Sequence, residues 1–248
     1  MVWNRRDMLW KRHDNGAPLR RVQPRATLNA ERIKRNVVVI GASAGGVTAL
    51  AQLFASLPPK LPAVIGVVLH RSTSPSELAA VLGRRSSLPV IEPQEDGRSL
   101  KQGLIYLAPA DSHLVFEANA ALIRRGPKEH STRPAVDPLF RSAADVFGRR
   151  VIGVLLSGCG EDGVSGLISI SQASGLALVQ DPAEAIMPYM PMNALQFDDV
   201  GASLPLTQMA LVLDALTNGR AVTVPGSPHP SRRPPAQSAK QHKPTGKS

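Results

Sequence analysis

The residues of this chain best suited to chemistry begin with a serine in a turn of small residues. Ser43 stands in the stretch Gly41-Ala-Ser-Ala-Gly45, which matches the pattern G-x-S-x-G. In that pattern the small neighbours let a strand bend sharply into a helix and hold the serine oxygen above the edge of a sheet. The N-terminal end of such a helix favours the negative charge that develops during acyl transfer. The pattern therefore predicts that Ser43 is a nucleophile.

Two other interpretations of this turn stay open at the level of the sequence. Gly41, Gly45 and Gly46 could form a phosphate-binding turn, although Ser43 replaces the middle glycine of the dinucleotide pattern G-x-G-x-x-G. Ser43 could also merely cap the helix that follows, since serine is a preferred N-cap residue. The partners that a nucleophilic serine needs elsewhere in the chain must decide between these interpretations.

A base and an acid for Ser43 are predicted at the ends of two other apolar runs. His70 directly follows the run 63–69, and Asp162 lies in the glycine-rich segment 157–163 after the run 151–156. The histidine can take the serine proton, while the carboxylate fixes the tautomer of the imidazole. Glu161 is the rival acid, but the glycines around Asp162 favour the latter. As alternatives, His70 could be only a polar strand end and Asp162 only the N-cap of the next helix.

The order of these residues along the chain is itself informative. Serine, histidine and aspartate follow one another, whereas α/β-hydrolases have the order serine, acid, histidine. A histidine after the acid is available only as His229 or His242, near the C-terminus, so an α/β-hydrolase is disfavoured. His113 and His130 flank a predicted hairpin region and could line the same cleft as His70.

Alternating apolar patterns predict the scaffold that brings these residues together. Buried strands are indicated at 37–40, 63–69, 151–156 and 176–180, and helices near 46–57, 75–84, 137–147, 163–174 and 206–217. Segments 104–107, 113–116 and 121–123 lie close together between turn residues and suggest a small antiparallel hairpin region. Strands that alternate with helices form right-handed crossovers over a parallel sheet. We therefore expect an α/β fold with three αβα layers, doubly wound around a mainly parallel sheet, with the site at the carboxyl ends of the strands.

The positive charge of the chain is concentrated at its two ends. The formal net charge is +10, yet residues 37–217 hold thirteen basic and sixteen acidic residues. We expect a basic N-terminal extension at 1–36, a catalytic domain at 37–217, and a basic, disordered tail rich in Pro, Ser and Lys at 218–248. Neither end interleaves aromatic residues in a pattern that reads nucleic acid, so no specific nucleic-acid partner is expected.

Composition also excludes several classes of protein. No apolar run approaches the roughly 20 residues of a membrane helix, and the N-terminus lacks the apolar stretch of a signal peptide. A single cysteine, Cys159, excludes an internal disulfide and a cysteine-built metal site. We therefore expect a cytoplasmic protein without membrane insertion.

Several separated motifs together resemble a known family. These are residues 38–50, His70 at its strand end, and the stretches 107–114, 133–144, 156–163, 180–181 and 190–191. In this order they are similar to the catalytic domain of the bacterial chemotaxis protein-glutamate methylesterases (CheB type), over about residues 36–217. The departures include Cys159 in place of methionine, Arg71-Ser72 in place of Met-Pro, and Tyr189 in place of glycine.

The resemblance implies an activity and a set of roles. Members of the family hydrolyse γ-glutamyl methyl esters on the cytoplasmic helices of chemoreceptors, release methanol, and in some cases deamidate receptor glutamines. Their triad falls on Ser43, His70 and Asp162, and their oxyanion-hole N–H groups fall on His70 and Cys159. Ala44, Arg71 and Met190 are predicted to line the substrate cleft. No metal or organic cofactor is expected. A basic extension of 36 residues cannot form the phospho-receiver domain of about 120 residues that many members carry, so control through an attached receiver is not expected.

Two competing functions keep the fold but change its use. The same triad could serve a glutaminase-type deamidase or a small-molecule esterase, and a deep apolar pocket would favour the esterase. A non-catalytic signalling module would instead bind a receptor or partner through the fold, an interpretation that Ser43, His70 and Asp162 argue against.

Overall fold

A computed structural model describes residues 25–74, 76–94, 96–197 and 200–225. Its centre is a seven-stranded sheet with the strand order β11-β10-β9-β2-β3-β6-β4. These strands are β2 (Val37–Ala42), β3 (Val64–Leu69), β4 (Val90–Ile91), β6 (Leu104–Leu107), β9 (Val151–Leu155), β10 (Leu176–Gln180) and β11 (Ala202–Leu204). Every neighbouring pair in this sheet is parallel. The predicted parallel α/β sheet is therefore confirmed.

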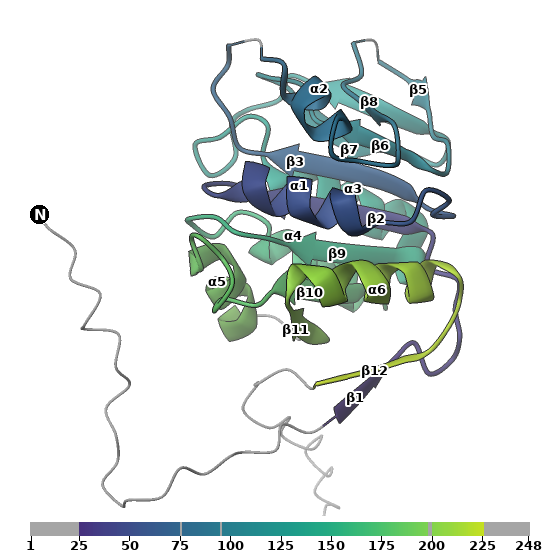
Figure 1. The fold of residues 1–248 in the computed structure, drawn as a ribbon. Coiled ribbons are helices and arrows are strands. Elements are labelled where there is room, and N and C mark those ends of the chain that lie inside the picture. The colour runs from purple at the N-terminus through teal and green to yellow at the C-terminus, as the bar shows by residue number, and fades with distance from the viewer. Residues whose placement is uncertain (1–24, 75, 95, 198–199, 226–248) are drawn as a thin grey trace, which may run out of the picture.

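Helices cover both faces of this sheet, as Figure 1 shows. One face carries α1 (Gly46–Ser56), α2 (Leu78–Gly83) and α6 (Leu206–Thr217), and the other carries α3 (Val136–Phe147), α4 (Val164–Gln172) and α5 (Tyr189–Phe197). Successive side chains of a strand point to opposite faces, so Val38 and Ile40 pack with α1 while Val37 and Val39 pack with α3. Continuous β-branched runs suit strands buried on both faces, and the three-layer arrangement follows.

A three-stranded antiparallel sheet lies beside the α3 side of the domain. It consists of β5 (Arg98–Ser99), β8 (Ala120–Arg124) and β7 (His113–Phe116) in that order. Residues 104–107 were predicted to belong to this set, but they form β6 and pair with β3 in the main sheet. Their apolar residues are buried on both sides, with Tyr106 packed edge-on against Phe116. This burial accounts for the difference.

Two described strands lie outside the predicted catalytic domain of 37–217. Strand β1 (Arg25–Leu28) pairs antiparallel with β12 (Val222–Pro225), and both lie outside those bounds. Leu28 and Val224 are buried against the α6 face of the core. The two strands are short and lie far apart in the sequence, so no local pattern reveals their pairing. Of the predicted basic ends, residues 1–24 and 226–248 lie outside the described residues.

The strand register sets the place of the loops that matter for function. Ala42 pairs with Leu69, and Gly41 pairs with Leu155. The carboxyl ends of β2, β3 and β9 therefore meet at one edge of the sheet, with β2 in the middle.

Of the helices within the described residues, none is long and apolar enough to cross a membrane.

Candidate active site

Ser43 lies on the turn between β2 and α1. Its backbone N–H donates to the carbonyl of Ser157 at 3.0 Å, and its carbonyl accepts from the N–H of Gly46 at 2.8 Å. Gly45 has φ +77°, and a Cβ atom there would lie 2.6 Å from Ser157 Oγ, so the turn requires glycine for both reasons. Helix α1 begins after Gly45 without a side-chain cap. The interpretation of Ser43 as a helix cap is therefore wrong.

His70 lies beside Ser43 because the strands that carry them are in register. Each residue follows the last residue of its strand, and Ala42 and Leu69 are paired, which places the two backbones about 5 Å apart. The Nε2 atom of His70 lies 2.6 Å from Asp162 Oδ2. The Nδ1 atom forms no hydrogen bond within the described part of the chain, and neither does Ser43 Oγ. The structure thus places His70 on the strand next to that of Ser43 and bonds it to Asp162.

Asp162 is held from several sides. Its side chain is 2% exposed, and it accepts the N–H groups of Val136 at 2.7 Å and Asp137 at 3.0 Å. Burial alone would raise the pKa of Asp162, but hydrogen bonds from His70 and these two N–H groups outweigh burial and hold the pKa below its ordinary value. The carboxylate therefore stays ionised at neutral pH and can orient His70.

The alternatives for the acid can be compared directly. Helix α4 begins after Gly163 without a side-chain cap, so Asp162 does not cap the helix that follows it. Its two oxygens instead accept from the first turn of α3. Glu161, the rival acid, is exposed and forms no side-chain hydrogen bond within the described ranges. Of the two candidate acids, Asp162 is the one that bonds His70.

The two predicted oxyanion-hole donors differ in their availability. The backbone N–H of His70 donates to the carbonyl of Ala42 at 3.0 Å, so it is not free to bind an oxyanion in this conformation. This corrects the prediction, since parallel pairing simply continues for one residue beyond β3. The N–H groups of Cys159 and Ala44 have no hydrogen bond within the described residues. Ala44 directly follows the nucleophile, which is where a G-x-S-x-G turn places an oxyanion donor.

The sequence did not single out Ser157, yet it connects three parts of the site. Its hydroxyl donates to the carbonyl of Ala44 at 2.8 Å and accepts the N–H of Met187 at 2.9 Å. Its own N–H donates to Gln180 Oε1 at 2.8 Å, and its carbonyl holds the N–H of Ser43. A serine at the end of a strand is common, so the stretch Leu156-Ser157-Gly158 does not by itself indicate a functional role for Ser157.

The three predicted cleft residues lie in different settings. Ala44 is exposed beside Ser43. Met190 is fully buried, and its sulfur lies 2.0 Å from where a Cβ atom on Gly158 would be, so it supports the loop after β9 from behind. It does not line an open cleft, because helix α5 turns its side chain inward.

Arg71 also differs from its predicted place in the substrate cleft. Its side chain is 9% exposed, and the guanidinium donates to Glu92 at 2.6 Å and to the carbonyl of Ala108 at 2.8 Å. It therefore ties the loop after β3 to the ends of β4 and β6. Glu92 also lines an open, largely polar cavity of about 670 Å³ at this edge of the sheet, together with Thr73, Asp111, Ser112 and Arg125.

Fold and site together define an α/β protein with a serine-hydrolase type of site at the edge of a parallel sheet. Residues 38–213 match the family model described as CheB methylesterase. The chain therefore belongs to the CheB methylesterase family.

Individual relatives agree with this assignment. The chain is 40% identical over 207 residues to protein-glutamate methylesterase/protein-glutamine glutaminase 2 of Anaeromyxobacter dehalogenans, covering 83% of this chain and 59% of that protein. It is 34% identical to a putative protein of the same description from Leptospira interrogans, covering 70% of this chain and 90% of that protein. The crystal structure of the Thermotoga maritima CheB methylesterase catalytic domain has a TM-score of 0.69 and 32% identity, and the match covers 74% of this chain and all (100%) of that one.

Proposed function

We propose that this protein hydrolyses γ-methyl esters of glutamate residues on chemoreceptor-like proteins, with Ser43 as nucleophile, His70 as base and Asp162 as the acid that orients it. The observation that carries the proposal is the 2.6 Å bond between His70 Nε2 and Asp162, one strand away from Ser43 in register. The curated relatives named above carry both methylesterase and glutaminase in their names. The helical region of a receptor that such an enzyme meets lies in the cytoplasm, so we place the enzyme there as well.

The geometry supports a two-stage acyl transfer. Ser43 Oγ attacks the ester carbonyl carbon while its proton passes to His70 Nδ1, because Nε2 is held by Asp162. The carbonyl oxygen becomes an oxyanion, for which the N–H groups of Ala44 and Cys159 are the available donors. Collapse of this intermediate breaks the bond to the methoxy group, which leaves as methanol with the proton from His70. Water then attacks the acyl-enzyme by the same route, and the products are the glutamate carboxylate and free Ser43.

A glutaminase activity needs no further residue. With a glutamine side chain the leaving group is ammonia instead of methanol, and His70 delivers the same proton to it. Amide nitrogen leaves less readily than methoxide, so protonation by His70 matters more in that reaction. We therefore propose the deamidase activity as the second activity of the same site.

The test is methanol release from methylated receptor fragments by the full chain. Replacing Ser43 by alanine should lower kcat by about 10⁴-fold or more, since removal of a triad nucleophile leaves only binding and electrostatic contributions. Ser56→Ala is the matched control, because Ser56 is exposed at the far end of α1 and its hydroxyl bonds only the carbonyl of Gln52. Full activity of Ser43→Ala would refute the assignment.

A further inference from the structure

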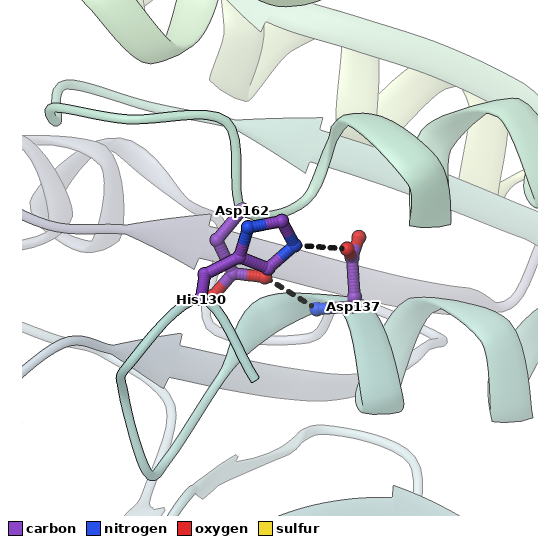
Figure 2. A group of neighbouring side chains, drawn as sticks. All are labelled: His130, Asp137 and Asp162. Atoms are coloured by element: carbon purple, nitrogen blue, oxygen red, sulfur yellow. Dashed lines mark hydrogen bonds and ion pairs between the residues drawn. The ribbon is translucent and has the colours of Figure 1, made fainter. Parts of the chain in front are cut away.

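A second histidine–carboxylate pair lies directly behind Asp162. His130 Nε2 is 3.0 Å from Asp137 Oδ2, and Figure 2 shows this pair next to Asp162. Asp137 is 1% exposed, whereas the side chain of His130 is 42% exposed. Asp137 lies in the first turn of α3, and His130 comes from the loop that precedes this helix. The proposed mechanism assigns no role to either residue.

The two buried carboxylates cap each other's helices. Asp162, just before α4, accepts the N–H groups of Val136 and Asp137 at the start of α3. Asp137, at the start of α3, accepts the N–H groups of Gly163 at 3.0 Å and Gly166 at 2.7 Å at the start of α4. First-turn N–H groups have no partner within their own helix. Each carboxylate thus accepts the free N–H groups of the helix that adjoins the other carboxylate. Because Asp137 holds the start of α4, which directly follows Asp162, the position of Asp162 depends on Asp137.

A cation does not fit this cluster, although His130, Asp137 and Asp162 place possible ligand atoms within 4.8 Å of one another. Both oxygens of Asp162 already accept from His70 or α3, and those of Asp137 accept from α4 and His130. A metal ion would have to displace the hydrogen bond that orients the proposed base. The arrangement is a hydrogen-bonded support.

Charge distinguishes the two carboxylates. Burial raises the pKa of Asp137, and the nearby charge of Asp162 raises it further, against the hydrogen bonds from Gly166 and His130. Arg141, which is paired with Glu129, lies 4.0 Å from Asp137. His70, which follows β3, contacts this cluster through its hydrogen bond to Asp162. Asp137 lies one residue beyond the bond that orients His70.

We propose that Asp137, held from the solvent side by His130, is a positioning residue that fixes Asp162 and thereby His70 through reciprocal helix capping. This inference rests on the proposed triad and goes beyond it. Asp137 touches no substrate; its effect passes through Asp162. Removing its oxygens should free the loop 157–163, while removing only its charge should leave the caps in place.

Two substitutions separate these effects. Asp137→Ala removes the acceptor for Gly163 and Gly166, so kcat should fall about 10- to 100-fold with KM within about 2-fold, since small misplacements of catalytic groups cost this much. Asp137→Asn keeps an acceptor oxygen and should recover most of kcat. Asp145→Asn is the control, since Asp145 is exposed on the same helix.

The readouts are chosen so that this inference and the proposed substrate can fail separately. Methanol release from a methylated receptor fragment gives kcat and KM, and the rate at which a fluorophosphonate labels Ser43 reports the triad without any receptor. Labelling without methanol release would refute the substrate and leave the test of Asp137 intact. No labelling of the unaltered protein would overturn both.

The outcome for Asp137 is decided by the comparison of variants. Wild-type kcat and labelling rate in folded Asp137→Ala would overturn the proposal, and so would an equal loss in Asp137→Ala and Asp137→Asn. If Asp137→Ala does not fold, the kcat and labelling rate of Asp137→Asn decide, and a loss of about 10-fold or more in either would overturn the proposal. His130→Ala should lower the labelling rate less than Asp137→Ala does, because the two α4 caps remain; a greater loss would overturn the order of roles.

Discussion

A methyl group added at Gly158 tests how tightly the loop after β9 is fitted against the nucleophile. In Gly158→Ala the new Cβ atom would lie 2.0 Å from Met190 Sδ and 2.8 Å from Ser43 Cβ. Gly158 is not among the residues with positive φ, so the effect is steric and not a backbone preference. Carbon atoms in contact prefer about 3.5–4.0 Å. Met190 must therefore shift by about 1.5 Å or more, and Ser43 by about 0.7–1.2 Å.

Both stability and activity should respond. Overpacking of this size costs about 1–3 kcal/mol, which urea denaturation would measure. A displacement of the nucleophile by about 1 Å should lower kcat for methyl-ester hydrolysis about 10²-fold. Gly160→Ala is the matched control in the same loop, because no heavy atom lies within 4 Å of its added Cβ while its φ of +91° strains the backbone. It should lose about 1 kcal/mol of stability and keep its kcat.

A double variant separates the two contacts. Met190→Ala removes the sulfur, so in Gly158→Ala/Met190→Ala the stability losses should be less than additive by about 1–3 kcal/mol. The contact with Ser43 remains, so kcat should stay low. Wild-type kcat in Gly158→Ala, or an equal loss in Gly160→Ala, would refute the reasoning that the loop positions Ser43 by close packing.

Three further outcomes follow from the buried polar contacts, each measurable by urea denaturation. The pKa of Asp162 is lowered, so the ionised carboxylate stabilises the fold above the unfolded pKa of about 4, and this stabilisation is lost as pH falls through the folded pKa. Asp162→Asn should therefore lower the free energy of unfolding at pH 7, and a loss that persists unchanged at pH 3 would contradict this. The pKa of Asp137 is raised, so its contribution to the free energy of unfolding is present below about pH 4 and is lost as pH rises through the folded pKa. The stability of Asp137→Asn should therefore rise relative to that of the wild type between pH 4 and 7, and a difference that stays constant over this range would argue against this. Ser157→Ala should cost about 1–3 kcal/mol because the N–H of Met187 and the carbonyl of Ala44 lose their partner, and should also slow methanol release; an unchanged rate would show that Ser43 does not depend on this contact.

Much of the scaffold could be predicted because local patterns carry it. The apolar runs at 37–40 and 176–180 are short, which is typical of buried strands, and both are strands in the structure. The helix at 206–217 has the predicted bounds. Helix α5 was not predicted, since Pro191 and polar neighbours obscure its periodicity. The pairing of β1 with β12 joins residues nearly two hundred positions apart, and such contacts leave no local pattern.

The sequence by itself determined the chemistry that is available. It placed Ser43 on a G-x-S-x-G turn, His70 at a strand end and Asp162 in a glycine-rich loop, because turn chemistry and apolar runs are local properties. Only the tertiary structure decided which atoms meet. It directed His70 Nε2 to Asp162, used the N–H of His70 in the sheet, and turned Arg71 and Met190 away from the cleft positions predicted for them. It also set Asp137 against α4, a contact that depends on two helices packing side by side. Hydrogen-bond partners of this kind depend on register and helix packing, which no short stretch of sequence contains.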